Sequence, residues 1–249
     1  MFNLFKKKEV RKKERGNKEY KLVVDLHSHL IPGIDDGSKN MKESLSILKG
    51  MEALGYEKII TTPHIMLDAY KNSSEIINNG LKNLREEALK NGISLKIEAA
   101  AEYYLDDGFE DLLKKGDMLT ISNKYILFET SYFAKPMQLE EMIFAITSSG
   151  YIPLMAHPER YRYVKDPLKE YKRFKELGVL LQINLNSFAG HYGKDAVRKA
   201  NFLSSNGMID FLGSDVHNLK QVDSLSDVFV SEAYRDIFVN NTILNDTLK

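Results

Sequence analysis

The chain has 249 residues, of which 43% are hydrophobic and 28% are charged, and its 35 Lys and Arg residues balance 35 Asp and Glu residues. This composition is typical of a chain with a buried core and excludes a disordered one. The absence of Cys excludes a disulfide framework, a thiolate metal site and a cysteine nucleophile.

The net charge of zero is the sum of two unequal parts. Residues 1–20 form a basic leader with eight Lys and Arg residues and three Glu residues, so residues 21–249 carry the compensating negative charge. A flexible, solvated leader is the first interpretation, and contact of its cations with an anionic membrane or an acidic partner is the second. A single basic stretch beside a mildly acidic body argues against a nucleic-acid-binding protein.

The sequence also carries no membrane or export signal. No apolar run approaches the ~20 residues that a membrane-spanning helix needs, and the N-terminus lacks the continuous apolar segment of a secretory signal. We therefore expect a cytoplasmic protein in which residues 21–249 form one domain.

Seven short β-rich runs alternate with stretches of helical period. The runs cover residues 22–26, 58–62, 95–101, 125–130, 151–156, 179–185 and 208–213. Apolar residues recur with helical spacing over 41–48, 77–88, 139–146 and 196–203, and a Gly follows each stretch. The alternation implies a parallel α/β sheet, because parallel neighbours need a crossover connection. Seven such units in one domain favour a closed barrel over an open sheet.

Histidines and carboxylates stand where these strands end. Parallel α/β folds place their active sites at the C-terminal ends of the strands, and five of the six His residues follow predicted strands. His27 and His29 are two positions apart in extended chain, so their side chains point the same way and can chelate one ion. Asp215 and His217 repeat this spacing. The candidate ligands are His27, His29, Asp36, His64, Glu102, Glu129, His157, Asp215 and His217.

The chemistry of these candidates indicates more than one ion. Imidazole and carboxylate ligands without sulfur suit Mn, Fe or Zn and disfavour Cu(I). One tetrahedral zinc ion uses about four ligands, so this number of candidates indicates two or three ions that share bridging carboxylates. Glu98, which shares a strand face with Glu102, is the alternative ligand on its strand. Glu129 can instead be an ordinary strand-end carboxylate, and Asp36 can be an Asx-turn residue.

Five motifs together resemble a known family. They are Asp25-Leu-His27-Ser-His29, Pro32-Gly33-Ile-Asp35-Asp36-Gly37, Thr61-Thr-Pro-His64, Ala156-His157-Pro-Glu-Arg160 and Gly213-Ser-Asp215-Val-His217. The first three resemble the PHP (polymerase and histidinol phosphatase) superfamily. With the last two, the chain resembles the manganese-dependent protein-tyrosine phosphatases encoded in bacterial capsule and exopolysaccharide loci, over residues 22–217.

The resemblance implies a distorted (β/α)7 barrel and three divalent ions, typically manganese. It assigns the first ion to His27, His29, Glu102 and Asp215, the second to Glu102, Glu129 and His157, and the third to Asp36, His64 and His217. It also implies that Arg160 binds the substrate phosphate. Many relatives place a basic residue several positions after the last motif as a second phosphate contact. Lys220 is the only cation in that run here and is predicted to replace it.

The physical chemistry of such a site agrees with phosphate ester hydrolysis. Clustered divalent ions lower the pKa of a bridging water toward ~7, which generates a hydroxide nucleophile at neutral pH, and Arg160 can donate two parallel hydrogen bonds to a phosphate. The lack of Cys independently excludes a phosphocysteine route. The aromatic residues that can wall a slot for a substrate ring, or pack in the core, are Tyr103, Tyr104, Tyr132, Phe133, Tyr161 and Tyr163. His191 is expected in an exposed loop, with approach to the site as the alternative.

Three hypotheses about function follow. The leading one is a metal-dependent phosphotyrosine phosphatase, and the resemblance implies that its substrate is the tyrosine-rich tail of a bacterial tyrosine kinase that controls polysaccharide assembly. A small-molecule phosphatase, such as histidinol-phosphate phosphatase, is the alternative enzyme on the same scaffold. A non-catalytic, metal-stabilised binding module recruited through the basic leader is the third, and the intact ligand set argues against it.

Overall fold

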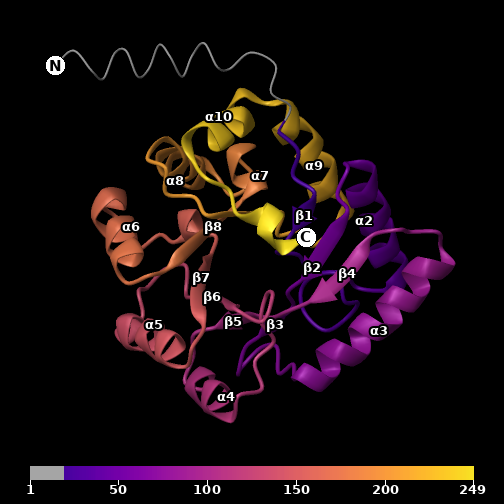
Figure 1. The fold of residues 1–249 in the computed structure, drawn as a ribbon, viewed down its shortest axis with the longest axis horizontal. Helices are drawn as coiled ribbons and strands as arrows, with labels where there is room; N and C mark the ends of the chain where they lie inside the picture. Colours follow the sequence, from indigo (N-terminus) through magenta and orange to yellow (C-terminus); the bar gives the residue numbers. More distant parts are fainter. Residues whose placement is uncertain (1–19) are drawn as a thin grey trace.

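In the computed structural model, which describes residues 20–249, strands form in all seven predicted regions and the labelled strands pair in parallel (Figure 1). One sheet has the order β1-β2-β4, with bounds Val24–Asp25, Lys58–Thr61 and Lys96–Ala99. The other has the order β3-β5-β6-β7-β8-β9, with bounds His64–Ile65, Glu102–Tyr104, Tyr125–Glu129, Ile152–Ala156, Leu180–Asn184 and Phe211–Gly213. The leader predicted over residues 1–20 lies outside the described residues except for Tyr20.

Two strand regions are interrupted where the chain passes from the first sheet to the second. Thr62 and Pro63 separate β2 from β3, and Ala100 and Ala101 separate β4 from β5. Pro63 has no N–H to give to a ladder, so the second region breaks there. Its carbonyl still accepts a hydrogen bond from the Glu102 N–H at 3.1 Å, which keeps the neighbouring regions side by side.

The first and last strand regions adjoin and complete a ring. Beyond β1 and β9, Ser28 and Val216 form a parallel bridge. The Asp215 N–H donates to the His27 carbonyl at 2.8 Å, and the His29 N–H donates to the Val216 carbonyl at 3.0 Å. The predicted distorted (β/α)7 barrel is therefore confirmed, with two separate ladders in place of one continuous sheet.

Helices surround the ring of strands (Figure 1). Their bounds are α2 Met41–Ala53, α3 Ser74–Lys90, α4 Phe109–Lys115, α5 Leu139–Ser148, α6 Pro167–Glu176, α7 Leu185–Phe188, α8 Lys194–Ser205, α9 Leu219–Val230 and α10 Glu232–Asn240. The four predicted helical stretches lie within α2, α3, α5 and α8. In α3, Ser73 caps the first turn, and the predicted apolar face of Ile77, Leu81, Leu84 and Ala88 is buried. None of the helices in residues 20–249 is long and apolar enough to cross a membrane.

The C-terminal segment η2 (Asn245–Leu248) covers the N-terminal ends of the strands. The Asn245 amide donates to the Val24 carbonyl at 3.0 Å and to the Leu212 carbonyl at 2.8 Å, so it joins the first strand to the last. The buried Lys58 ammonium donates to the Leu248 carbonyl at 2.7 Å. The opposite end of the barrel, where the strands finish, is left for the candidate site.

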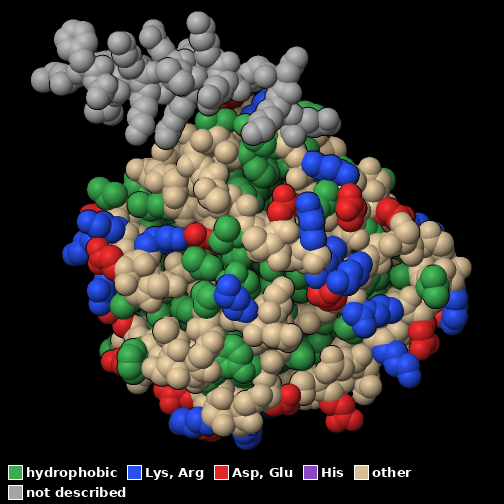
Figure 2. Space-filling view, viewed as in Figure 1, with side chains coloured by type: hydrophobic (Ala, Val, Ile, Leu, Met, Phe, Trp, Pro, Cys, Tyr) green, Lys and Arg blue, Asp and Glu red, His purple; other side chains and the backbone are tan. Residues whose placement is uncertain are grey.

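Two buried apolar clusters hold this architecture together. The smaller one contains strand residues such as Val24, Leu127, Leu154 and Phe211 together with Leu248 of η2, so it fills the barrel. The larger one packs the helices against the outside of the strands. On the face drawn in Figure 2, Lys and Arg side chains lie among Asp and Glu side chains, as expected for the balanced composition.

Candidate metal centre

All nine predicted ligands gather at the C-terminal ends of the strands, in four overlapping groups. Within each group, one donor atom from every residue lies within 4.8 Å of the others. The groups are His27, His29 and Asp215; His27, Glu102 and His157; His64, Glu102 and Glu129; and His29, Asp36, His64 and His217. The barrel thus brings together side chains that lie in or directly after six different strand regions of the chain, with His64 and Glu102 at the starts of β3 and β5 and Glu129 at the end of β6.

The densest contacts join two imidazoles to two carboxylates. His27 Nε2 lies 3.3 Å from His29 Nε2, 3.2 Å from Glu102 Oε2 and 3.4 Å from Asp215 Oδ1. His29 Nε2 lies 3.4 Å from Glu102 Oε2 and 3.3 Å from Asp215 Oδ1. Neighbouring ligands of an ion with ~2.1 Å bonds lie ~3.0–3.4 Å apart. The spacing of these buried donors is therefore that of ligands around one cation.

Glu102 lies between the groups. Its Oε1 accepts a hydrogen bond from His157 Nε2 at 2.9 Å. His64 Nδ1 lies 3.3 Å from Glu102 Oε2 and 3.2 Å from Glu129 Oε1, yet this buried nitrogen makes no hydrogen bond. Burial raises the pKa of Glu102, but the His27 and His64 imidazoles hold it well below its usual range. A charged, buried carboxylate with donors on both oxygens has the geometry of a bridging ligand.

Asp36 joins two imidazoles at the outer edge of the centre. Its Oδ1 lies 3.4 Å from His64 Nε2 and 3.5 Å from His217 Nε2. Partial burial raises the pKa of Asp36, but hydrogen bonds from His217 and His64 hold it below its usual range. The Asx turn belongs to the preceding residue, because Asp35 Oδ1 accepts the Gly37 N–H at 3.0 Å. The alternative interpretation of Asp36 as the turn residue was wrong.

The second ring nitrogen of three imidazoles has its own partner. His29 Nδ1 lies 2.9 Å from Asp35 Oδ2, and His27 Nδ1 lies 2.7 Å from Gln182 Oε1. His217 Nδ1 lies 2.9 Å from a backbone carbonyl. These contacts fix the ring orientations, so that each Nε2 faces the centre. The sequence did not single out Asp35 or Gln182 for this role: Asp35 is part of the second motif, and Gln182 lies in the middle of β8.

The backbone adopts a left-handed conformation at two of the nine residues. The φ angles are 35° at His157 and 51° at Asp215, directly or shortly after β7 and β9. A non-Gly residue in this region costs about 1–3 kcal/mol, and such residues cluster at functional sites. Asp25 stabilises the backbone turn at Asp215: its carboxylate accepts from Ser214 N at 2.8 Å and from Ser214 Oγ at 2.7 Å. Burial raises the pKa of Asp25 to about 6.

Arg160 stands beside the ligands in a cavity of about 370 Å³. Its Nη1 donates to Asp215 Oδ2 at 2.9 Å. The guanidinium carbon lies 4.6 Å from the Tyr132 ring centre and 4.2 Å from the Tyr192 ring centre, so two aromatic faces hold it. Tyr192, which the sequence did not single out, also donates its hydroxyl to Asp215 Oδ2 at 3.2 Å.

The structure also places three further residues that the sequence singled out, Lys220, His191 and Glu98. Lys220 is exposed in the first turn of α9 and is not among the cavity-lining residues, whereas its neighbour Gln221 is. The structure therefore does not bring Lys220 to the site as a second phosphate contact. His191 lies in an exposed loop and also lines the cavity, so both interpretations of it hold. Glu98 Oε2 pairs with Lys58 at 2.7 Å and belongs to none of the ligand groups in residues 20–249.

Of the six aromatic residues predicted as a slot or as core, Tyr132 alone lines the cavity beside the ligands. Tyr103 and Tyr161 are buried in the apolar core. Phe133 is 70% exposed and lines a second pocket next to this cavity. Most of the aromatic residues predicted to form a slot therefore pack in the core or at the rim of the barrel instead.

Comparison with known proteins identifies the family. The family model described as "Capsular polysaccharide synthesis, CpsB/CapC" matches residues 23–226. The chain belongs to the CpsB/CapC family. Among its CpsB/CapC relatives, the tyrosine-protein phosphatase YwqE of Bacillus subtilis is 30% identical over 80% of this chain and 78% of its own. The tyrosine-protein phosphatase CpsB of Streptococcus pneumoniae is 27% identical over 88% of this chain and 96% of its own.

Solved structures agree with the CpsB/CapC assignment. A crystal structure from a study of YwqE and the pneumococcal CpsB, described as unique metal-dependent tyrosine phosphatases, matches with a TM-score of 0.76 at 28% identity. The match covers 88% of this chain and 96% of that one. An amidohydrolase from Mycoplasma synoviae, 15% identical with a TM-score of 0.53, is similar in fold alone.

Proposed function

We propose that this CpsB/CapC chain is a metal-dependent protein-tyrosine phosphatase. The observation that carries the proposal is the gathering of nine imidazole and carboxylate ligands beside a cationic side chain, Arg160. A cluster of divalent ions next to a guanidinium suits an anionic phosphate ester. The relatives named tyrosine-protein phosphatase support phosphotyrosine as the ester.

The donor set fits two or three divalent ions, and we propose Mn²⁺, with Fe and Zn as alternatives. The ligands are nitrogen and oxygen without sulfur, which is the preference of these metals. The His27 and His29 Nε2 atoms each lie 3.2–3.4 Å from Glu102 Oε2 and Asp215 Oδ1, which is the spacing of ligands around one ion. The proposed sets are His27, His29, Glu102 and Asp215; Glu102, Glu129 and His157; and Asp36, His64 and His217. When bound, such ions supply an activated water nucleophile and neutralise charge on phosphate oxygens.

Arg160 binds and orients the phosphate in this proposal. A planar guanidinium can donate two parallel N–H bonds to phosphate oxygens, which an ammonium cannot do. The Asp215 carboxylate and the faces of Tyr132 and Tyr192 hold its plane before a substrate arrives. A donor that is fixed in advance stabilises the negative charge that develops in the transition state without a cost of reorganisation.

The leaving group and the location follow from the proposed substrate. Tyrosinate leaves with a pKa of ~10, so the site needs a weaker general acid than an alkyl phosphate would demand. The phosphotyrosine protein that we propose is the tail of a bacterial tyrosine kinase of polysaccharide assembly, in keeping with the capsule-synthesis description of the family. Because kinases use cytoplasmic ATP, we propose that the phosphatase acts in the cytoplasm.

A substrate panel on metal-quantified protein tests the proposal. The purified full chain is loaded with Mn²⁺, its metal content is measured, and its kcat/KM is compared for a phosphotyrosine peptide and for histidinol phosphate. Faster turnover of the peptide supports the proposed activity. Faster turnover of histidinol phosphate would reverse the assignment to a small-molecule phosphatase. Bound metal with no turnover of any phosphate monoester would leave the binding module as the better hypothesis.

A further inference from the structure

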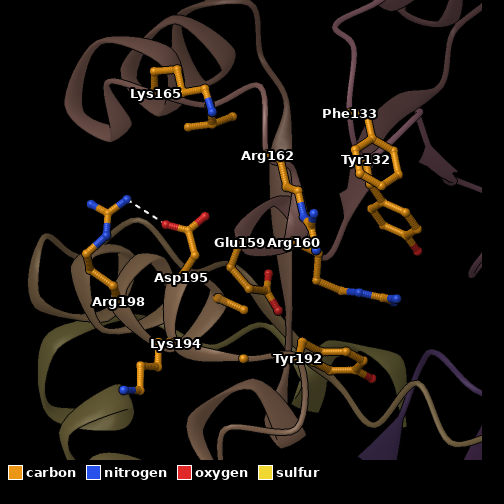
Figure 3. Close-up of a pocket in the computed structure, with 13 residues that line it drawn as sticks. Tyr132, Phe133, Glu159, Arg160, Arg162, Lys165, Tyr192, Lys194, Asp195 and Arg198 are labelled. Carbon is orange, nitrogen blue, oxygen red and sulfur yellow. Dashed lines mark hydrogen bonds and ion pairs between the residues drawn. The ribbon is translucent and has the colours of Figure 1, made fainter.

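A second pocket of about 520 Å³ adjoins the metal cavity. The two hollows share three residues, Tyr132, Arg160 and Tyr192, which therefore form a common wall. Figure 3 shows Arg160 and Arg162 between the Tyr132–Phe133 segment and the rest of this pocket. A molecule whose phosphate sits in the metal cavity would reach the second pocket by crossing that wall.

Cationic side chains dominate the second pocket. They are Arg160, Arg162, Lys165, Lys194 and Arg198 (Figure 3). The two lining carboxylates belong to Glu159 and Asp195. Arg160 is committed to Asp215, but the other four cations are exposed and come from the loop after η1 (Pro158–Arg160) and from α8.

The two carboxylates leave most of this positive charge uncompensated. Glu159 is fully buried, and its Oε1 accepts from Ser187 Oγ at 2.6 Å and from the Asn184 N–H at 3.0 Å, so this oxygen is occupied by groups of the protein. Asp195 is shared by Arg198 at 2.8 Å and by Lys199 at 2.7 Å. In Figure 3 the ion pair of Arg198 with Asp195 lies at one side of the pocket.

Three of the cations that line the pocket have no carboxylate partner among the described residues. In the part of the chain that the structure describes, Lys165 and Lys194 have no ion pair. The Arg162 guanidinium lies 5.0 Å from the Phe133 ring centre and likewise has no acidic partner among residues 20–249. Unpaired cations around a concave surface focus a positive potential there and favour an anionic ligand.

We propose that this basic pocket is a substrate subsite for an anionic group on the peptide that carries the phosphotyrosine. The group is an acidic side chain or a second phosphate, since both would bind the same cations. The proposal rests on the proposed phosphatase function. An extended peptide advances ~3.3 Å per residue, so the anion would lie within about three residues of the phosphotyrosine. The subsite selects acidic substrates and leaves the reacting atoms to the metal centre.

Matched charge variants test the subsite. The first variant is Arg162→Gln/Lys165→Gln/Lys194→Gln, which keeps Arg160 and all proposed metal ligands. The control is Lys42→Gln/Lys49→Gln/Lys82→Gln, which removes the same charge from exposed positions on α2 and α3. The kcat/KM of each protein is measured for three phosphotyrosine peptides of one length: one with neutral flanks, one with flanking Glu residues and one with a second phosphotyrosine. A small aryl phosphate serves as the flank-free substrate.

We expect the unaltered chain to prefer at least one anionic peptide over the neutral one, mainly through KM, by about tenfold at low salt. The preference should shrink with added salt and disappear in the pocket variant but not in the control variant. The more favoured of the two anionic peptides identifies the group as carboxylate or phosphate. Equal turnover of all three peptides, or an equal loss for all substrates in the pocket variant, would overturn the subsite. Turnover of the neutral peptide would still support the proposed phosphatase in that case, so the two failures are distinguishable.

Discussion

Arg160 Nη1 and Asp215 Oδ2 lie 2.9 Å apart, which ties the proposed phosphate-binding residue to a proposed metal ligand. The same oxygen accepts from Asn184 Nδ2 at 2.6 Å, while Asp215 Oδ1 lies 3.4 Å from His27 Nε2 and 3.3 Å from His29 Nε2. The two oxygens of one carboxylate therefore serve different neighbours. We therefore expect a substitution of Arg160 to disturb substrate binding while Asp215 Oδ1, the oxygen that faces the imidazoles, stays in place.

The first prediction concerns the shape of the Arg160 side chain. Arg160→Lys keeps one positive charge but loses the planar pair of donors, so we expect a higher KM, a lower kcat and a fall in kcat/KM on the order of 100-fold. Metal content, measured by elemental analysis, should stay at the level of the unaltered chain. Unchanged kinetics would remove Arg160 from the phosphate site.

The second prediction concerns the proposed ligands themselves. His27→Ala and Asp215→Ala each remove a buried donor from the densest group, so both should abolish phosphatase activity and reduce bound metal. His191→Ala is the matched control, since His191 lines the cavity but belongs to no ligand group in residues 20–249. It should keep its full metal content. Full occupancy in both ligand variants would contradict the assignment.

The third prediction concerns the residue behind His29. Asp35→Asn keeps an oxygen for the turn to Gly37 but removes the carboxylate that holds the His29 ring. Loss of such an orienting partner lowers metal affinity by about 10- to 100-fold in other sites, and we expect a Kd for Mn²⁺ that rises by at least the lower figure. Titration calorimetry gives the Kd, and circular dichroism checks that the fold persists. An unaltered Kd would show that His29 needs no such support.

The fourth prediction concerns pH and the far end of the barrel. Glu98 pairs with the buried Lys58 and with Lys96, both at 2.7 Å. Partial burial raises the pKa of Glu98, but Lys58 and Lys96 hold it below its usual range. The pairing therefore stabilises the fold above the ordinary carboxyl pKa, and this contribution is lost as the pH falls through the lowered value.

Glu98→Gln should thus reduce the free energy of unfolding by about 1–2 kcal/mol at pH 7, because a buried ammonium loses its counter-charge. Urea denaturation at pH 7 and toward pH 3 measures the difference, which should shrink in acid. The double variant Lys58→Met/Glu98→Gln should recover part of the loss. A gap of the same size at both pH values would contradict this account.

The sequence predicted the strands, four helices and the nine gathered residues because each depends on a local pattern. His27 and His29 share one side of an extended chain whatever packs around them, and parallel strands bring their C-terminal ends to one edge. The periodic apolar face of α3 is buried for the same local reason. None of these predictions depends on knowing which residues far apart in the sequence come into contact.

The contacts that depend on tertiary packing were not predictable in this way. Tyr192 reaches Asp215 from the loop between α7 and α8, 23 positions away in the chain, and Gln182 meets His27 from a strand 155 positions away. Lys220 was misplaced because a helix, α9, begins at Leu219 and directs the next side chain to solvent. The charge of a residue and its spacing from a motif do not determine whether its side chain, in the first turn of a helix, points to the site or to solvent.

The contact between the first and last strand regions determines when the metal centre can form during synthesis of the chain. The hydrogen bonds between Asp25 and Ser214, which stabilise the turn at Asp215, join residues 189 positions apart. Asn245 joins the same two strands by hydrogen bonds at the other end of the barrel. During synthesis, the imidazoles of His27 and His29 are therefore made long before the carboxylate that completes their group. Contacts of such long range are typical of slow folding. The centre can only form once nearly the whole chain has left the ribosome, so an incomplete chain would carry the first ligands without the site.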